Sequence, residues 1–217
     1  MPRKSIGLLA MSTDSTQWYL KRLLDTKNAG DVENPVFPTN FDAINQLLPP
    51  PSSELQELLY SYLPSDGEID YLLVPNITIH EVLDLLFSLH SMPYLLVHPI
   101  TLTINKLMEN KVDEVVIFGS SYTMQQGYVS ENLEQAGVTC SFPSKEDILT
   151  IDACRSAVYQ NMASKELIEN FNVLVQKYAK EKPVVLSCTE LSMAYAGNVA
   201  QVYDMAQLQL NFCNNQR

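Results

Sequence analysis

Short apolar runs alternate along the chain with longer segments in which apolar residues recur every three or four positions. The short runs are bounded by turn-forming residues, as in buried strands, and the longer segments have the period of amphipathic helices. Strands are predicted at 5–10, 71–74, 94–98, 115–118, 139–142 and 183–187. Helices are predicted at 16–24, 53–62, 80–90, 100–109, 124–135, 145–160 and 165–180. Such alternation builds parallel sheets covered by helices, which predicts an α/β fold.

A weak internal repeat relates the two halves of the chain. Residues 6–16 resemble 115–123, because each segment runs from an apolar strand into a hydroxyl-rich turn and then into a helix. Residues 71–78 resemble 184–189 in the same way. The repeat predicts two pseudo-symmetric, doubly wound α/β halves, each with a mostly parallel sheet. Because open α/β sheets bind ligands at the carboxyl ends of their strands, we expect these four strand ends to line an active-site cleft between the halves.

Composition and charge exclude several classes of partner. The chain has 217 residues, of which 46% are hydrophobic, so it can bury a sizeable core. Its formal net charge of -11 disfavours nucleic acid as a partner. The longest candidate for a targeting helix, at 6–11, is far shorter than the roughly 20 apolar residues that span a bilayer. We therefore expect no nucleic-acid or membrane partner.

The cysteines, histidines and glycines argue against metals and common cofactors. The four cysteines form no CxxC pair, and the three histidines lack the i, i+4 spacing that places two imidazoles on one helix face. Neither GxGxxG nor GxxxxGK[ST] occurs. We expect a cytoplasmic protein without a structural metal, a dinucleotide or a P-loop.

Cys188 is the most distinctive candidate for chemistry. It follows the strand predicted at 183–187 and precedes Thr189-Glu190-Leu191, which has the pattern of a helix start. Helix N-terminal amides favour a thiolate, so the expected pKa of Cys188 is lowered and the thiolate could act as nucleophile or general base. A small, buried core cysteine is the alternative interpretation.

Hydroxyl residues gather at two predicted helix starts, where backbone amides could bind a carboxylate. They are Ser12, Thr13, Ser15 and Thr16, and in the second half Ser120, Ser121 and Thr123. Ordinary N-capping is the alternative role for these hydroxyls. Asn76, Thr78 and His80 form a third loop of this type, in which a helix N-terminus would favour the neutral imidazole of His80.

Taken together, these segments resemble the cofactor-independent aspartate/glutamate racemase family over nearly the whole chain. Residues 6–19 resemble the family's first strand with its Gly-Met-Gly-type turn, and 39–42 resemble a following short segment. Residues 117–127 are similar to a segment with two threonines around a small turn, with Ser120 and Thr123 in those places. The most specific match is Val-Val-Leu-Ser-Cys-Thr-Glu-Leu at 184–191, which resembles the family's second catalytic cysteine motif.

The resemblance implies an enzyme without pyridoxal phosphate or any other cofactor, which holds an amino acid between two α/β halves. In the family, one thiolate removes the α-proton and a second thiol returns a proton on the opposite face, which inverts the centre. Cys188 matches the second thiol, whereas Asn76 occupies the place of the first when 76–80 is aligned with Cys-Asn-Thr-x-His. An amide cannot accept and return a proton near pH 7. Ala163 stands where aspartate-specific members carry a lysine.

Three functions therefore stay open: an active racemase, a one-cysteine decarboxylase or isomerase of the same superfamily, and a noncatalytic amino-acid-binding homologue. The racemase is the leading interpretation, with aspartate or glutamate as substrate and a homodimer as a possible assembly. The expected halves are 1–97 with 199–217, and 98–198. Cys188, Asn76 and His80 are the candidate catalytic residues. The candidate substrate-binding residues are Met11, Ser12, Thr16, Thr78, Ser120, Thr123, Thr189 and Glu190.

Overall fold

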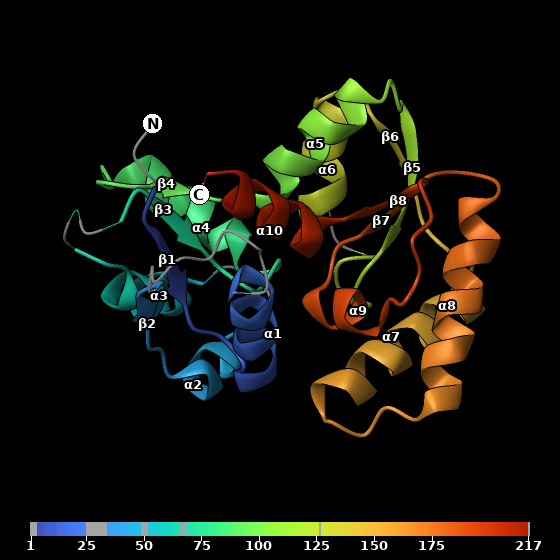
Figure 1. Cartoon of the computed structure of the whole chain (residues 1–217), viewed down its shortest axis with the longest axis horizontal. Coiled ribbons are helices and arrows are strands. Elements are labelled where there is room, and N and C mark those ends of the chain that lie inside the picture. Colours follow the sequence, from blue (N-terminus) through green and yellow to red (C-terminus); the bar gives the residue numbers. More distant parts are fainter. Residues whose placement is uncertain are drawn as a thin grey trace. The chain divides into compact units, whose positions relative to one another are not determined.

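The computed structural model describes residues 4–24, 34–48, 52–65, 67, 69–125 and 127–216. The chain divides into two compact units. The first contains Met1–His98 and Gln209–Arg217, and the second contains Pro99–Leu208 (Figure 1). Each unit is built around one four-stranded sheet.

The first unit is a parallel sheet with the strand order β2-β1-β3-β4. Its elements in chain order are β1 (Ile6–Leu9), α1 (Thr13–Leu24), β2 (Val36–Phe37), α2 (Phe41–Gln46), α3 (Ser53–Tyr62), β3 (Tyr71–Leu73), α4 (His80–Leu89) and β4 (Leu95–Leu96). The central strands β1 and β3 pair in the register Leu8 to Leu73. Their carboxyl ends therefore lie at the same edge of the sheet.

The second unit has a parallel sheet with the strand order β6-β5-β7-β8. Its elements are α5 (Pro99–Glu109), β5 (Glu114–Phe118), α6 (Tyr128–Gln135), β6 (Thr139–Ser141), α7 (Lys145–Tyr159), α8 (Lys165–Ala179), β7 (Val184–Leu186), α9 (Thr189–Ala194), β8 (Val202–Asp204) and the beginning of α10 (Met205–Asn215). The order repeats that of the first sheet, with β5 in the place of β1 and β7 in the place of β3. The predicted fold of two similar, doubly wound parallel α/β halves is confirmed.

The chain passes from the second unit back to the first within α10, at Gln209 rather than at the expected residue 199. The difference arises because 202–204 form a strand: Val202 pairs with Val184 of β7, which keeps this segment in the second sheet. Gln209 is fully buried in the first unit. Its Nε2 donates to the carbonyl oxygen of Val97 at 2.7 Å, and its Oε1 accepts from the Tyr19 hydroxyl at 2.7 Å.

Serine caps determine where three of the predicted helices begin. Ser52, Ser144 and Ser164 each accept a hydrogen bond from the backbone amide three residues later, which starts α3, α7 and α8. In contrast, α6 begins at Tyr128 and not at the predicted residue 124. The residues before it are held in a turn, where the Ser120 carbonyl accepts from the Met124 amide at 2.9 Å.

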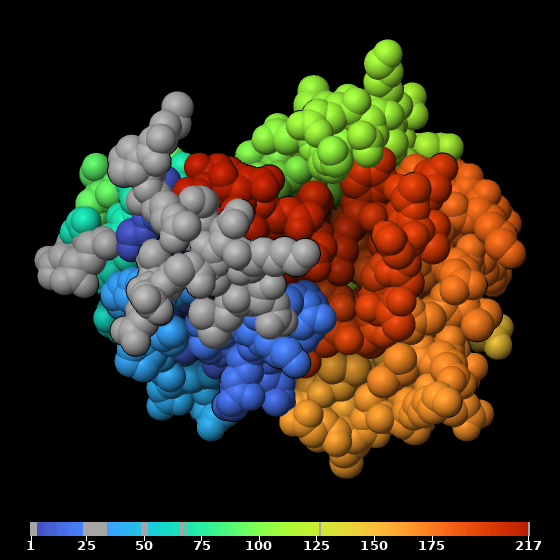
Figure 2. All heavy atoms as spheres, in the orientation of Figure 1, coloured from blue at the N-terminus to red at the C-terminus, as the bar shows by residue number. Residues whose placement is uncertain are grey.

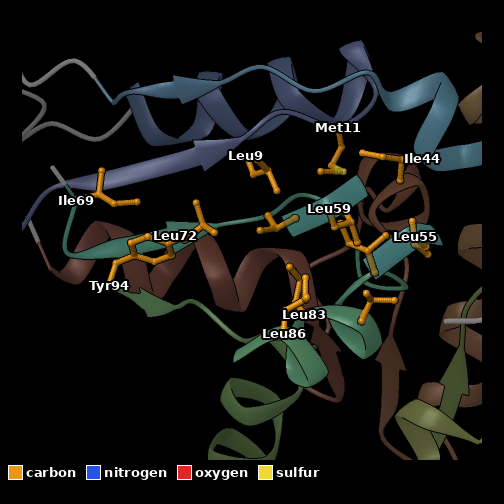
Figure 3. Close-up of a cluster of buried hydrophobic side chains, with 13 residues drawn as sticks. Leu9, Met11, Ile44, Leu55, Leu59, Ile69, Leu72, Leu83, Leu86 and Tyr94 are labelled. Atoms are coloured by element: carbon orange, nitrogen blue, oxygen red, sulfur yellow. The ribbon is translucent and has the colours of Figure 1, made fainter. Parts of the chain in front are cut away.

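The apolar faces of these elements pack into one core in each unit. In the first unit, Leu9 and Leu72 from the sheet meet Leu55 and Leu59 from α3 and Leu83 from α4 (Figure 3). All five of these side chains are fully buried. This burial supplies the main favourable free energy of the fold.

The second core is formed by the inner strands and by three helices. Phe118 and Leu186 come from the sheet, Ile151 from α7, Phe171 from α8 and Leu191 from α9. The outer side chains of α7 and α8 form a continuous surface of this unit, shown in orange in Figure 2. Among the described residues, no helix is long and apolar enough to cross a membrane.

Candidate functional site

The junction between β7 and α9 carries the predicted cysteine motif. β7 is completely buried, and Ser187 after it donates both its backbone amide and its hydroxyl to the Phe118 carbonyl, each at 2.8 Å. A Cβ on Gly119 would lie 2.7 Å from Ser187 Oγ and 2.9 Å from Thr123 Cβ. The close approach of the β5 and β7 ends therefore requires a glycine at position 119.

Cys188 is the N-cap residue of α9, with an extended backbone at φ -152° and ψ 130°. Its thiol accepts no capping hydrogen bond. Instead, Sγ donates to Glu190 Oε2 at 3.0 Å, and the residue is 9% exposed. The side chain is thus fixed against a carboxylate at the carboxyl end of a central strand.

The expected lowering of the Cys188 pKa is wrong. Burial raises this pKa well above its ordinary value, and the charge and hydrogen bond of Glu190 raise it further. The Leu191 amide and the Arg155 guanidinium act in the opposite direction but do not outweigh them. The resting group at neutral pH is therefore a protonated thiol, which is a proton donor rather than a ready nucleophile.

Thr189 and Glu190 lie beside this thiol. Thr189 is 3% exposed, and its Oγ1 is buried with no hydrogen-bond partner in the described part of the chain. Leaving a buried hydroxyl unpaired costs about 1–3 kcal/mol, so such groups are often completed by a ligand or by water. The hydroxyl of Ser192, one turn later, is by contrast bonded to Asp204 Oδ1 at 2.7 Å.

The loop between β5 and α6 brings two predicted hydroxyls together. Ser120 Oγ lies 3.0 Å from Thr123 Oγ1 and also accepts from the Thr123 amide at 3.1 Å. Thr123 is buried, and Ser120 is half-buried. Because β5 pairs directly with β7, this loop and Cys188 lie at the carboxyl ends of neighbouring strands.

Two charged residues of α7 belong to the same unit and were not predicted. Arg155 Nε donates to Asp152 Oδ1 at 2.6 Å, and Asp152 also accepts from the Ser121 amide and hydroxyl. The guanidinium interacts electrostatically with Cys188 and Glu190. The i, i+3 spacing of Asp152 and Arg155 indicates an ion pair in the sequence, but nothing in that spacing connects it with Cys188.

In the first unit, the β1–α1 turn uses its hydroxyls for internal bonds. Thr16 Oγ1 accepts from the Met11 amide at 2.9 Å. Ser12 Oγ donates to Ser15 Oγ at 2.8 Å, and the Ser15 hydroxyl lies 3.1 Å from the Ser12 carbonyl. Met11 itself belongs to the apolar core of this unit. The turn therefore has the hydrogen bonding of a helix start, which was the alternative considered for it.

The loop after β3 is also bonded within itself. Asn76 Oδ1 accepts from the Ile79 amide at 3.3 Å, and His80 Nδ1 donates to the Asn76 carbonyl at 2.7 Å. His80 is fully buried, and its Nε2 has no partner within the described residues. Burial, with a smaller contribution from His98, lowers the pKa of His80 to about 3. The imidazole is neutral, as predicted, although burial is the cause; Thr78 is half-buried in this loop.

The structure thus places the predicted residues in two clusters, one in each unit. Met11, Ser12 and Thr16 follow β1, and Asn76, Thr78 and His80 follow its neighbour β3. Ser120 and Thr123 follow β5, and Cys188, Thr189 and Glu190 follow β7. Over the described ranges, no group of three His, Cys, Asp or Glu side chains is placed to hold a metal ion.

The fold with its two similar four-stranded parallel sheets is shared with solved structures of aspartate/glutamate racemases. No family model and no curated protein matches the sequence. Solved structures do: a candidate Asp/Glu racemase from Yersinia pestis has a TM-score of 0.77 at 19% identity, with 98% of each chain covered.

Two further racemase-related structures have the same fold. An aspartate racemase homologue from Pyrococcus horikoshii is 20% identical, with a TM-score of 0.77 and 97% of each chain covered. A glutamate racemase from Francisella tularensis, solved in complex with D-glutamate, is 11% identical with a TM-score of 0.60. That match covers 97% of this chain and 79% of the other. The fold agrees with the resemblance found in the sequence.

Proposed function

We propose that this protein is an amino-acid racemase that works without pyridoxal phosphate and transfers a proton at the Cα of aspartate or glutamate through Cys188. One observation carries the proposal. In a racemase fold, the end of β7 presents a thiol that is hydrogen-bonded to the carboxylate of Glu190. The unpartnered Thr189 Oγ1 beside it supports a ligand at this strand end.

The proton transfer follows from the protonation state of the pair. A second group first removes the α-proton from one face of the substrate and leaves a planar carbanion at Cα; the candidates for this role are Thr78, Ser12 or His80 acting through a water. The Cys188 thiol then gives its proton to the other face, which forms the new C–H bond and leaves a thiolate. In the reverse direction, the thiolate takes the α-proton and becomes the thiol again. Glu190 holds the thiol in one orientation through the 3.0 Å hydrogen bond. A positioned acid or base of this kind accelerates proton transfer about 10²- to 10⁴-fold.

Two sets of residue roles stay predictions: catalysis by Asn76 and His80, and substrate binding by Met11, Ser12, Thr16, Thr78, Ser120, Thr123, Thr189 and Glu190. The role of Thr189 is supported by its hydroxyl, which has no partner in the described chain and can bond to a substrate without breaking an internal hydrogen bond. Ser12 and Thr16 would exchange an internal bond for one to the substrate. A homodimer, a cytoplasmic location and aspartate or glutamate as the substrate likewise stay predictions.

One observation favours a second candidate, a reaction that uses a single thiol. Asn76 occupies the first cysteine position of the resemblance, and its Oδ1 is engaged by the Ile79 amide. A protonated Cys188 could then deliver a proton to one face of a carbanion that is produced by loss of carbon dioxide. The substrate of such a decarboxylase would be a malonate-type diacid, in which both carboxylates are attached to the same carbon. That carbon becomes the carbanion when one carboxylate leaves as carbon dioxide.

The test is proton NMR of L- and D-aspartate and L- and D-glutamate in deuterated buffer, with enantiomer composition followed in parallel. We expect the wild type to lose the α-proton signal with inversion. Cys188→Ala should stop the exchange. The matched control is Cys140→Ala, because Cys140 lies on β6 and bonds to the carbonyls of Ser130 and Val138.

Each outcome separates the candidates. Exchange with inversion that depends on Cys188 supports the racemase. Exchange with retention indicates proton transfer on one face. Release of carbon dioxide from a malonate-type diacid, without exchange of the four amino acids, supports the decarboxylase. Turnover that is unchanged in Cys188→Ala excludes the thiol as the acid, and binding without any turnover indicates an amino-acid-binding homologue.

A further inference from the structure

Arg155 is the cation of the Cys188 cluster, and it is held by an ion pair with Asp152, whose carboxylate is itself bonded to Ser121. Its Nε donates to Asp152 Oδ1 at 2.6 Å. Asp152 Oδ1 also accepts from the Ser121 amide at 3.2 Å, and Asp152 Oδ2 accepts from the Ser121 hydroxyl at 2.9 Å. Three donors thus fix the carboxylate of Asp152, and the carboxylate in turn fixes the plane of the guanidinium.

These contacts connect three elements of the second unit. Ser121 belongs to the loop after β5, next to Ser120, while Asp152 and Arg155 belong to α7. Cys154, the neighbour of Arg155 in the chain, shares a buried cluster with Cys188. The guanidinium interacts electrostatically with both Cys188 and Glu190. Arg155 is therefore anchored to the β5 loop and acts on the end of β7.

The geometry leaves part of the guanidinium available to a ligand. Within the described chain, the hydrogen bond of Arg155 runs through Nε to Asp152, and neither Nη nitrogen is part of that bond. The side chain is 27% exposed, so a ligand can reach it. A guanidinium held at Nε still presents a fork of N–H donors that matches the two oxygens of a carboxylate.

The charges around the thiol show why a carboxylate substrate needs this group. Glu190 lies 3.0 Å from the thiol, and Asp152 lies on α7, so both charged side chains other than Arg155 in this cluster are acidic. An anion that approached Cys188 without a cation would be repelled. Thr189 follows Cys188 directly in the chain, and its hydroxyl, which has no partner in the described chain, suits the carboxylate on the reacting carbon. The cation on the separate helix suits a second carboxylate farther along the substrate.

We propose that Arg155 binds the side-chain carboxylate of the substrate and so selects acidic amino acids, and that Asp152 and Ser121 are its positioning residues. The inference rests on the proposed function, because it places the reacting carbon at Cys188. It adds a specificity residue from a helix that the cysteine motif does not include. The Asp152 carboxylate keeps the guanidinium oriented before the substrate arrives, which lowers the entropy cost of binding.

The experiment compares Arg155→Met, Arg155→Lys and Asp152→Asn with the wild type in two assays. The first measures kcat and KM for α-proton exchange with aspartate and glutamate, and with asparagine and glutamine, which lack the side-chain charge. The second measures binding of aspartate and asparagine by calorimetry, which does not depend on turnover. Lys177→Met is the control, because it breaks the Lys177–Asp147 ion pair elsewhere on α7 and α8.

Arg155→Met should lower kcat/KM for the acidic amino acids about 10- to 100-fold, mainly through KM, which is the range for loss of a charge-assisted hydrogen bond. The values for asparagine and glutamine should change little. Arg155→Lys should recover part of the loss, and Asp152→Asn should reproduce a smaller loss. Lys177→Met should keep the wild-type preference for acids over amides.

The outcomes distinguish this inference from the proposed function. Wild-type preference for acids in folded Arg155→Met overturns the inference and leaves the racemase standing. An equal loss for acids and amides also overturns it, because Arg155 would then act on the α-carboxylate or on the thiol. Aspartate binding that depends on Arg155, without exchange in the wild type, supports the inference and overturns the racemase.

Discussion

The ends of β3 and β7 occupy the same place in their two sheets, yet their polar groups are used differently. After β3, Asn76 Oδ1 accepts from the Ile79 amide, and the Asn76 carbonyl accepts from His80. After β7, Cys188 makes no capping bond and points its thiol at Glu190, while Thr189 Oγ1 has no partner in the described chain. The β3 end caps its own backbone with Asn76 and leaves His80 Nε2 without a described partner, whereas the β7 end has no side-chain cap and leaves Thr189 Oγ1 without one.

This contrast bears on how an internal repeat can diverge. Both repeats retain the parallel sheet and the hydroxyl-bearing turn after the first central strand, because these features maintain the fold. The residue after the second central strand is free to change, since either a side-chain cap or a bound substrate can complete that loop. The comparison therefore predicts that reactivity is concentrated at β7.

The largest effect is expected from Asn76→Cys, which places a thiol at the β3 position that corresponds to Cys188. We expect racemisation of aspartate or glutamate to rise about 10²-fold or more, because a second positioned acid or base becomes available. Enantiomer composition followed over time measures it. Asn76→Ser, which keeps a capping oxygen but supplies no thiol, is the control. Equal rates in Asn76→Cys and Asn76→Ser would contradict the assignment of Asn76 to the first cysteine position.

The next effect concerns His80, whose pKa falls from an ordinary 6.5 to about 3 in the folded protein. As the pH drops below about 6.5, His80 becomes protonated in the unfolded chain, whereas in the folded protein it stays neutral until about pH 3. Stability contributed by this histidine is therefore present above pH 6.5 and is lost as the pH falls through that window. The slope is at most about 1.4 kcal/mol per pH unit.

His80→Gln, which can still donate to the Asn76 carbonyl, should remove this slope. The measurement is urea unfolding at several pH values between 3 and 7 for the variant and the wild type, because carboxylates common to both cancel in the difference. The groups that face His80 include His98, which lowers its pKa, and Asp84, which raises it. His90→Gln, at an exposed helix end, is the matched control. Parallel stability curves for His80→Gln and the wild type would count against burial as the cause.

A third effect isolates the thiol at β7. Glu190→Gln removes a negative charge that raises the Cys188 pKa, so the variant should be alkylated faster by iodoacetamide near neutral pH. Mass spectrometry of the peptide that contains Cys188 measures the rate. Glu169→Gln, in an ion pair on the surface of α8, is the control. An alkylation rate that does not respond to Glu190→Gln would show that burial alone sets the reactivity of the thiol.

The smallest effect compares capping at the two strand ends directly. Asn76→Ala should lower the free energy of unfolding by about 1 kcal/mol, because the Ile79 amide loses its acceptor. Thr189→Val should change it by less than about 0.5 kcal/mol, or stabilise slightly, because no hydrogen bond is lost. Chemical denaturation of both variants is the measurement. A larger loss for Thr189→Val than for Asn76→Ala would reverse the comparison.

Much of the fold could be predicted from local pattern. The strand at 184–186 is an apolar run and the helix at 53–62 begins after a serine cap, so both signals lie within a few residues. The strand at 36–37 was not predicted, because Pro35 and Pro38 leave only two residues between them. The strand at 202–204 was not predicted from the apolar pattern, because Asp204 interrupts its short apolar run. They are strands only because β1 and β7 offer free edges to pair with.

The residues of the candidate site stay predictions, whereas the expected lowering of the Cys188 pKa was wrong. Position after an apolar run was enough to single out Cys188, while Thr189 and Glu190 became candidates through the family resemblance. Arg155 and Asp152 were not predicted, because an i, i+3 pair on a helix is usually an exposed ion pair. Only the packing of α7 against α9 brings this pair to the site.

By itself, the sequence determined the α/β class, the internal repeat and the placement of a cysteine and hydroxyls at strand ends, because each is encoded by neighbouring residues. The tertiary structure decided the protonation of Cys188 and His80, the hydrogen bonds within the β3 loop, and the junction of Ser121, Asp152 and Arg155. A pKa depends on burial and on charges brought from distant segments, and those distances are set only when the chain packs.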